Sequence, residues 1–344
     1  MKTVNEKLEE WAVRKIERDF PDDICLLLDH KTLRLDKDEG KIGLESYVPN
    51  TPRSGGLART FIIDGIGYDL FPHNWETLEK MADVNHYNLT CLDDASIIWA
   101  RTEADRQRFE SLKEKFRANL KNPHLMLQRA QSWLSSAAEI YLDMIFEKEV
   151  YKIRKHAGYF CDLLAIAISY TNGTYFHRGQ NGQLAELRKL HSVPWGFIET
   201  YEKALFEKEP EVQKKHCQAL LGIARDYLKS LTIAAPAPKR GASELASWYH
   251  ELSYTFRRTR HYCEAGDAAS AYLWGCMLQD EIGIIVNDYN IAEIDIMGAF
   301  DSGNPASLAE RANQAERTII AAIEAEGGTL DVYTDIDDFL EKNQ

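Results

Sequence analysis

The stretch that decides the fold of the first part of the chain is Arg59–Met81, RTFIIDGIGYDLFPHNWETLEKM. Its apolar run, 61–63, is followed by Asp64-Gly65, a dipeptide in which both residues tolerate a positive φ. Such a dipeptide after an apolar run is a strong signal for a β-hairpin with a two-residue turn. The sequence therefore predicts a hairpin whose second strand covers 66–71, followed by a helix that reaches Met81.

One charged side chain interrupts the second strand of this hairpin. Asp69 lies between Tyr68 and Leu70, where a strand with a purely structural role rarely has a carboxylate. Because a carboxylate at the exit of a strand is a suitable metal ligand in phosphate chemistry, we expect Asp69 to be functional. The alternative is an edge-strand aspartate that caps the turn after it.

The residues around the hairpin predict a small domain with both helices and strands. The apolar spacing in 5–20 is typical of an amphipathic helix, and the apolar run 24–28 is typical of a central strand. The segment 41–48 predicts a further extended element. We therefore expect 1–101 to form an α+β domain with a mixed sheet.

Beyond this domain the pattern changes to helices. Apolar residues recur at spacings of three and four, which predicts an antiparallel helical bundle at 102–233. The segment 234–242 is rich in alanine and proline and has no periodicity, so we expect a linker there. Residues 243–344 are expected to form a further helical region with an acidic tail.

Acidic residues mark the expected helix starts. Thr102 is a predicted N-cap, and Glu103 and Asp105 follow it in the first turn. We interpret Asp93-Asp94 in the same way, because the helix dipole favours carboxylates near an N-terminus.

The hairpin and its carboxylate resemble the third strand of the DNA polymerase β-like nucleotidyltransferase superfamily. Within it, the kanamycin, streptomycin and lincosamide nucleotidyltransferases have a small α/β domain followed by a helical bundle. The resemblance covers roughly the first hundred residues of this chain. It implies an enzyme that transfers a nucleoside monophosphate from an NTP·Mg²⁺ substrate to a small hydroxylated acceptor.

Two motifs of that superfamily are replaced here. In place of a Gly-Ser turn after the first strand the chain has Asp29-His30, and in place of an Asp-x-Asp pair it has Lys41-Ile42-Gly43-Leu44-Glu45. The resemblance implies a site in which Asp69, Asp29 and Glu45 are catalytic and bind magnesium, which prefers hard oxygen ligands, while His30 and Lys41 contact the nucleotide. The alternative is a catalytically degenerate relative that binds a ligand or a partner, because a lysine at a ligand position repels a cation.

The bundle supplies a second set of polar residues. Tyr151 and Arg154 stand near the start of the most apolar predicted helix, and Tyr175 and His177 follow its end. In the antibiotic-modifying enzymes the helical domain contributes to substrate binding, so the resemblance implies that these four residues bind the acceptor. The alternative is that the tyrosines lie at the rim of the core and that Arg154 forms an ion pair.

Composition limits the classes of partner. The 344 residues carry a formal net charge of −13 and contain no run of Lys or Arg, which argues against nucleic-acid binding and fits a small, cationic substrate better. The apolar runs are too short to span a bilayer, and the six cysteines are scattered without zinc-ligand spacing. We therefore expect a cytoplasmic protein with no membrane partner. The oligomeric state stays open, with a homodimer as one possibility, and a helical interaction protein is a more distant interpretation.

Overall fold

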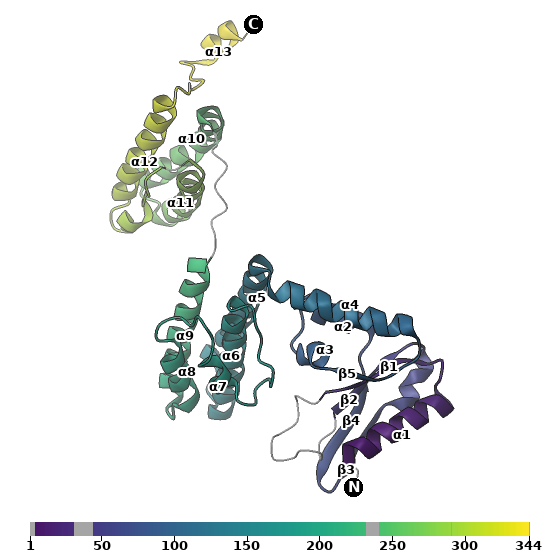
Figure 1. The fold of residues 1–344 in the computed structure, drawn as a ribbon. Helices are drawn as coiled ribbons and strands as arrows, with labels where there is room; N and C mark the ends of the chain where they lie inside the picture. The colour runs from purple at the N-terminus through teal and green to yellow at the C-terminus, as the bar shows by residue number, and fades with distance from the viewer. Residues whose placement is uncertain (1–3, 31–43, 232–240, 290, 344) are drawn as a thin grey trace. The chain divides into compact units, whose positions relative to one another are not determined.

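The chain divides into two compact units, Met1–Ile233 and Ala234–Gln344 (Figure 1). The computed structural model describes residues 4–30, 44–231, 241–289 and 291–343. The first unit contains a mixed five-stranded sheet and the second contains helices, so the α+β class expected from the sequence is correct at this level. Most of the expected linker 234–242 lies outside the described residues.

The sheet has the strand order β3-β4-β2-β1-β5. The central strand β2 pairs antiparallel with β1 and parallel with β4, while β3 and β4 form the expected hairpin. Its turn residues Asp64 and Gly65 have φ values of 53° and 78°, the left-handed conformations that a type I′ turn requires. The fifth strand was not expected from the sequence. The strands are β1 (Ile24–Asp29), β2 (Leu44–Pro49), β3 (Arg59–Ile63), β4 (Ile66–Pro72) and β5 (Ser96–Ala100).

The two faces of the sheet pack against different helices. Helix α1 (Val4–Asp19) covers one face, which we call the α1 face, where Ile16 packs with the strand residues Leu27, Tyr47 and Leu70. The opposite face, which we call the α4 face, packs against α2 (Trp75–Ala82) and α4 (Glu103–Leu120), and its buried strand residues include Leu26, Leu28 and Val48. Successive residues of each strand alternate between these faces.

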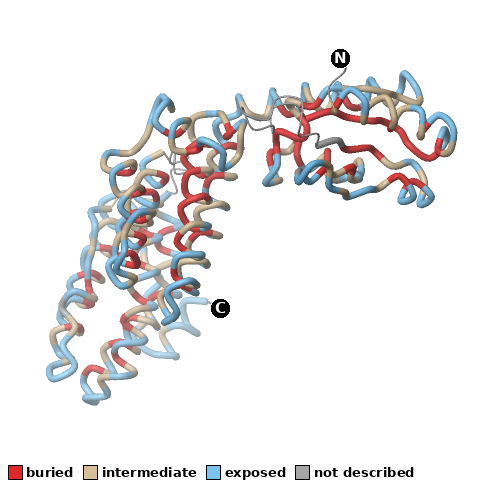
Figure 2. Tube along the Cα trace, turned by 90° about the horizontal axis from the view of Figure 1, so that it is seen from below, coloured by how far each residue is buried: buried red, intermediate tan, exposed pale blue. Residues whose placement is uncertain are grey.

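Helix α6 packs against α5, α7, α8 and α9, and its buried face is the most extensive of the first unit's described helices. Figure 2 shows buried residues along the helices as well as along the strands. The core of these helices is continuous with the core of the α4 face. The core of the α4 face thus extends from residues 1–101 into residues 102–233, while the core under α1 is separate. The helices are α3 (Thr90–Asp93), α5 (Pro123–Phe146), α6 (Val150–Thr171), α7 (Gln183–Leu187), α8 (Phe197–Phe206) and α9 (Pro210–Leu231), with a 3-10 turn, η3, at Pro52–Leu57.

The second unit is a small helical bundle with its own core. Phe256 of α10, Leu278 of α11 and Ile319 of α12 are fully buried in it. Its elements are α10 (Ala242–Glu264), α11 (Ala268–Tyr289), the 3-10 turn η4 (Met297–Ala299), α12 (Ala306–Ala325) and α13 (Ile336–Lys342).

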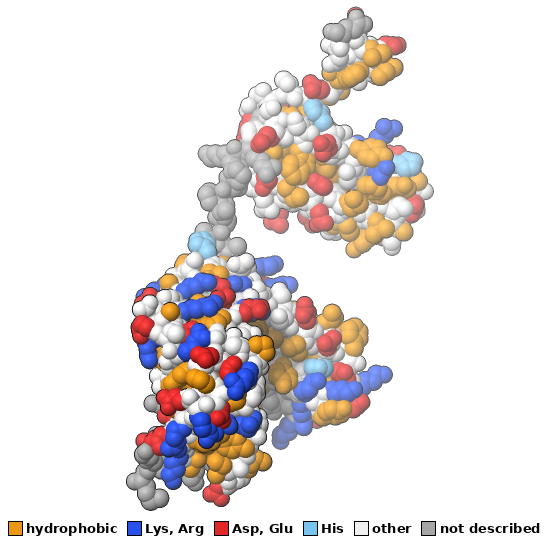
Figure 3. Space-filling view, turned by 90° about the vertical axis from the view of Figure 1, so that its right-hand side faces the viewer, with side chains coloured by type: hydrophobic (Ala, Val, Ile, Leu, Met, Phe, Trp, Pro, Cys, Tyr) orange, Lys and Arg blue, Asp and Glu red, His pale blue; other side chains and the backbone are white. Residues whose placement is uncertain are grey.

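The surface of the first unit mixes basic and acidic side chains over the face that Figure 3 shows. Among the described helices, none combines the length and the apolar character that crossing a bilayer requires.

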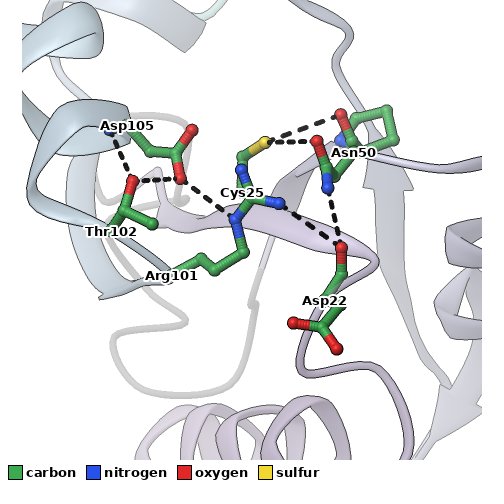
Figure 4. Close-up of polar contacts among 7 residues, drawn as sticks. Asp22, Cys25, Asn50, Arg101, Thr102 and Asp105 are labelled. Atoms are coloured by element: carbon green, nitrogen blue, oxygen red, sulfur yellow. Dashed lines mark hydrogen bonds and ion pairs between the residues drawn. The ribbon is translucent and has the colours of Figure 1, made fainter.

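A polar cluster joins the start of α4 to the β1–β2 end of the sheet (Figure 4). Arg101 contacts the Asp105 carboxylate through Nε at 3.2 Å and donates from Nη1 to the Asp22 carbonyl at 3.4 Å. The same carbonyl accepts from Asn50 Nδ2 at 2.7 Å. Thr102 Oγ1 accepts from the Asp105 backbone N–H at 3.1 Å, which confirms the predicted N-cap.

Replacing Gly65 by alanine tests the hairpin turn. Gly65 has a φ of 78°, where a Cβ atom costs about 1 kcal/mol, so we expect Gly65→Ala to lower the free energy of unfolding by about that amount in urea denaturation. Gly67 of β4 is the control, because an added Cβ has no neighbour within 4 Å and its φ is not positive. Equal losses for Gly65→Ala and Gly67→Ala would contradict this account of the turn.

Candidate functional site

The three candidate carboxylates lie at the same end of three neighbouring strands. Asp29, the last residue of β1, pairs with Glu45 near the start of β2. Glu45 pairs in turn with Leu70 of β4, the residue that follows Asp69. Strand pairing therefore brings all three positions to one end of the sheet, as a common site requires.

The same register places Asp69 on the opposite face from the other two. Asp29 and Glu45 occupy positions on the α1 face, because Leu70, the β4 partner of Glu45, belongs to the core under α1. Asp69 pairs with Leu44 and Thr60, and these are positions on the α4 face. Among the side chains that the structure describes, no three His, Cys, Asp or Glu residues are grouped so that they hold a metal ion. The set suggested by the sequence thus divides into a pair and a separate carboxylate.

The pair has the ligand chemistry that magnesium requires. Direct cross-strand partners have Cβ atoms about 5 Å apart, so the register places positions 29 and 45 side by side. Magnesium is commonly held by one or two carboxylates, with phosphate and water oxygens completing the octahedron. Asp29, which is 2% exposed, and Glu45 meet that requirement by position.

Asp69 lies among different neighbours on the α4 face. Its Oδ1 accepts a hydrogen bond from Thr60 Oγ1 at 3.0 Å. On the same face, His30 Nε2 lies 2.7 Å from Ser46 Oγ, and both side chains are buried. The His30 ring also stacks with Phe71 at a centroid distance of 6.4 Å, and its contact with a nucleotide stays a prediction. Lys41 lies outside the described residues.

His73 is a member of this face that sequence reasoning missed. Its ring packs edge-on against Phe71 at a centroid distance of 4.8 Å, and burial, followed by the neighbouring His86, lowers its pKa to about 4. The imidazole is therefore neutral at physiological pH. The sequence did carry a signal for it, because residues 69, 71 and 73 are spaced by two and therefore lie on the same face of the strand.

The four candidate bundle residues fall into two separate places. Tyr151 is 66% exposed in the first turn of α6, and Arg154 Nη2 donates to the Lys208 carbonyl at 3.4 Å. Tyr175 and His177 follow the other end of this helix, which has 22 residues and is therefore about 33 Å long. The structure does not bring the two pairs together around one small acceptor.

Tyr175 and His177 instead contact the two aspartates that follow α3. Tyr175, which is 5% exposed, donates from its hydroxyl to Asp93 Oδ2 at 2.9 Å, and His177 Nδ1 lies 3.6 Å from Asp94 Oδ2. Because α3 has four residues, Asp93 is an acidic residue of its first turn as well as its last residue, whereas Asp94 is its C-cap. The interpretation as helix N-terminal acids therefore holds for Asp93 and was wrong for Asp94.

The hydrogen bond to Asp94 raises the pKa of His177 above its ordinary value of 6.5, against the opposing effect of burial. His177 nevertheless keeps 47% of its side chain exposed. It is thus a solvent-facing, readily protonated group at the contact between the sheet-bearing segment and the bundle.

A second polar link joins the same two regions. The buried carboxylate of Asp162 on α6 accepts from Tyr87 Oη at 2.5 Å, from Gln180 Nε2 at 3.0 Å and from Gln183 Nε2 at 2.6 Å. Tyr87, Asp162 and Gln183 border a cavity of about 50 Å³, and Tyr170 forms another part of its wall. The cavity is large enough for little more than a water molecule, so this cluster holds the loop before α3 against α6.

No family model matches the chain, and no curated protein matches it. The solved structure of a nucleotidyltransferase-like protein from Exiguobacterium sibiricum 255-15 is similar to this chain. The similar region covers 65% of this chain and 75% of that protein. The identity is 13% and the TM-score is 0.40, and we base no conclusion on a similarity of this size.

Replacing Asp94 by asparagine tests the environment of His177. Because the folded-state pKa is raised, the protonated pair stabilises the fold fully below pH 6.5, and this contribution is lost as pH rises through the raised value. We expect the NMR-titrated pKa of His177 to fall in Asp94→Asn. Glu186 is a weaker cause of the shift, so Glu186→Gln should lower the pKa less. An unchanged pKa in Asp94→Asn would show that the pair does not form in solution.

Removing the Tyr87 hydroxyl tests the link to Asp162. A hydrogen bond to a charged group contributes about 1.5–3 kcal/mol, and because Tyr87 is 44% exposed we expect Tyr87→Phe to lower the free energy of unfolding by about 1.5 kcal/mol. Tyr159→Phe is the control, since that tyrosine of α6 is 55% exposed and its hydroxyl bonds to no other described residue. The link has no energetic role if chemical denaturation gives both variants the stability of the wild type.

Proposed function

We propose that this protein transfers a nucleoside monophosphate from a magnesium-bound nucleoside triphosphate to a small hydroxylated acceptor. The observation that carries the proposal is the register of β1 and β2, which makes Asp29 and Glu45 direct cross-strand partners at one end of the sheet. The resemblance of the Asp64–Phe71 hairpin to the nucleotidyltransferase superfamily supports the same reaction class.

Asp29 and Glu45 are the residues that we assign to the metal. When bound there, magnesium supplies positive charge to the triphosphate and orients its phosphates. The role of the two residues is to hold negative charge at adjacent positions, one of which is 2% exposed and therefore shielded from water. Carboxylates in such a setting attract a divalent cation more strongly than exposed ones do.

Two further residues have roles in this proposal. Asp69 lies on the α4 face, as His30 does. We assign Asp69 the role of orienting polar groups on that face, not the role of a metal ligand. His177 is the exposed member of the bundle pair next to α3, and we assign it to the acceptor. A hydroxylated and cationic acceptor suits the net charge of −13.

A second candidate function is ligand binding by a catalytically degenerate relative. One observation favours it: on the α4 face, the positions of β2 that flank Asp69 and Phe71 are Leu44 and Ser46, neither of which is a carboxylate. A catalytic site around Asp69 would need a second carboxylate from β2, and β2 supplies none on this face. Loss of turnover with retention of ligand binding is the behaviour that this candidate predicts.

Calorimetric titration with ATP and GTP, each with and without Mg²⁺, tests the proposal. We expect magnesium-dependent binding that weakens at least about tenfold in Asp29→Asn, which corresponds to about 1.4 kcal/mol. Asp69→Asn is the matched control and should change the dissociation constant less than about threefold, because it lies on the other face.

Three results would contradict the proposal. Absence of binding for both nucleotides removes the nucleotide site, equal weakening by the two variants contradicts the assignment to one face, and tight binding without pyrophosphate release for any hydroxylated acceptor favours the degenerate relative.

A further inference from the structure

A large cavity lies away from the sheet end and from the Asp29–Glu45 pair. Its volume is about 780 Å³, and it is formed where α4 meets α5, where α6 ends and where α9 ends. Apolar side chains make up most of its wall, among them Leu120, Met126, Leu127 and Tyr170. Cavities of a few hundred to a thousand Å³ with apolar walls are the usual size of small-molecule sites.

The ionisable side chains that line this cavity are both basic. Lys121 and His124 line it, and no Asp or Glu is present among its lining residues in the described part of the chain. Both side chains are exposed. In a chain with a net charge of −13, a cavity bordered by two basic groups and no acid is unlike the average surface.

One helix N-terminus at the cavity agrees with this sign. Pro123 and His124 are the first residues of α5, a helix of 24 residues whose N-terminal end carries partial positive charge. The C-terminal ends of α4, α6 and α9 also border the cavity, and side chains donate to two of the carbonyls there. Thr171 Oγ1 and Asn172 Nδ2 donate to the Ile168 carbonyl at 2.8 and 2.9 Å, and Ser230 Oγ donates to the Tyr227 carbonyl at 2.7 Å.

The geometry points to a binding site for a small apolar molecule that carries one anionic group, such as an aromatic or aliphatic acid. Its apolar body lies against Leu127 and Tyr170, and its anionic group lies at the mouth beside Lys121 and His124. The site is independent of the proposed transfer reaction. Tyr170 also forms part of the wall of the small cavity next to Asp162, so its ring separates this site from the link between α6 and the loop before α3.

Fluorescence titration with anilinonaphthalene sulfonate (ANS), an apolar aromatic anion, tests this site on the full-length protein. We expect saturable binding to one site per chain. Leu127→Trp places a larger side chain in the cavity and should weaken binding at least about tenfold. Leu142→Trp, at a 55% exposed position of the same helix α5, is the matched control and should leave binding unchanged. Near-ultraviolet circular dichroism checks that each variant keeps its packing, because ANS also binds loosely packed states.

Two further arms test the charge preference without altering the core. Lys121→Glu should weaken ANS binding several-fold, and the exposed Lys148→Glu should not. Phenylnaphthylamine, which is ANS without its sulfonate, should bind more weakly than ANS to the wild type. The proposal is overturned if ANS does not saturate, if Leu127→Trp binds like the wild type, or if Lys121→Glu and the uncharged probe leave the affinity unchanged.

Discussion

The parallel pairing of β2 with β4 is the constraint on which the positions of all the candidate acids depend. β2 lies between two partners, antiparallel β1 and parallel β4, and these two pairings fix the face that each residue of β1 and β4 occupies. A shift of one residue in the β2–β4 register would exchange the faces of Asp69 and Leu70. Leu70, which is 4% exposed in the core under α1, holds the observed register, because such a shift would expose it and bury the charge of Asp69.

The contact between the sheet-bearing segment and the bundle is built largely from polar groups around a continuous apolar core. Tyr175 and His177, which follow α6, contact Asp93 and Asp94. Tyr87, in the loop before α3, donates a hydrogen bond to Asp162 of α6. Because a carboxylate whose partners are removed keeps its desolvation cost, such links restrict how the two regions move apart. The consequence for function is that His177 is held at a fixed place relative to α3.

Local features were predictable from the sequence, whereas the pairing of distant segments was not. The Asp64-Gly65 turn and the Thr102 N-cap each depend on a few adjacent residues, and both are present. The division of the candidate acids between two faces depends on which strands lie beside β2. Since 14 residues separate β1 from β2 and 16 separate β2 from β4, local patterns do not determine it. The contacts of Asp93 and Asp94 with Tyr175 and His177 were not predicted for the same reason, since these partners lie about 80 residues away.

The most direct test of the central claim is a crystal structure of the protein with Mn²⁺ and a non-hydrolysable NTP, in which anomalous scattering locates the metal. The account predicts a manganese peak in contact with the carboxylates of Asp29 and Glu45, with Asp69 on the other face of the sheet and not coordinated. A peak bound to Asp69 without Asp29 and Glu45 would contradict the assignment. A nucleotide bound with no metal at either face would contradict the magnesium-dependent reaction itself.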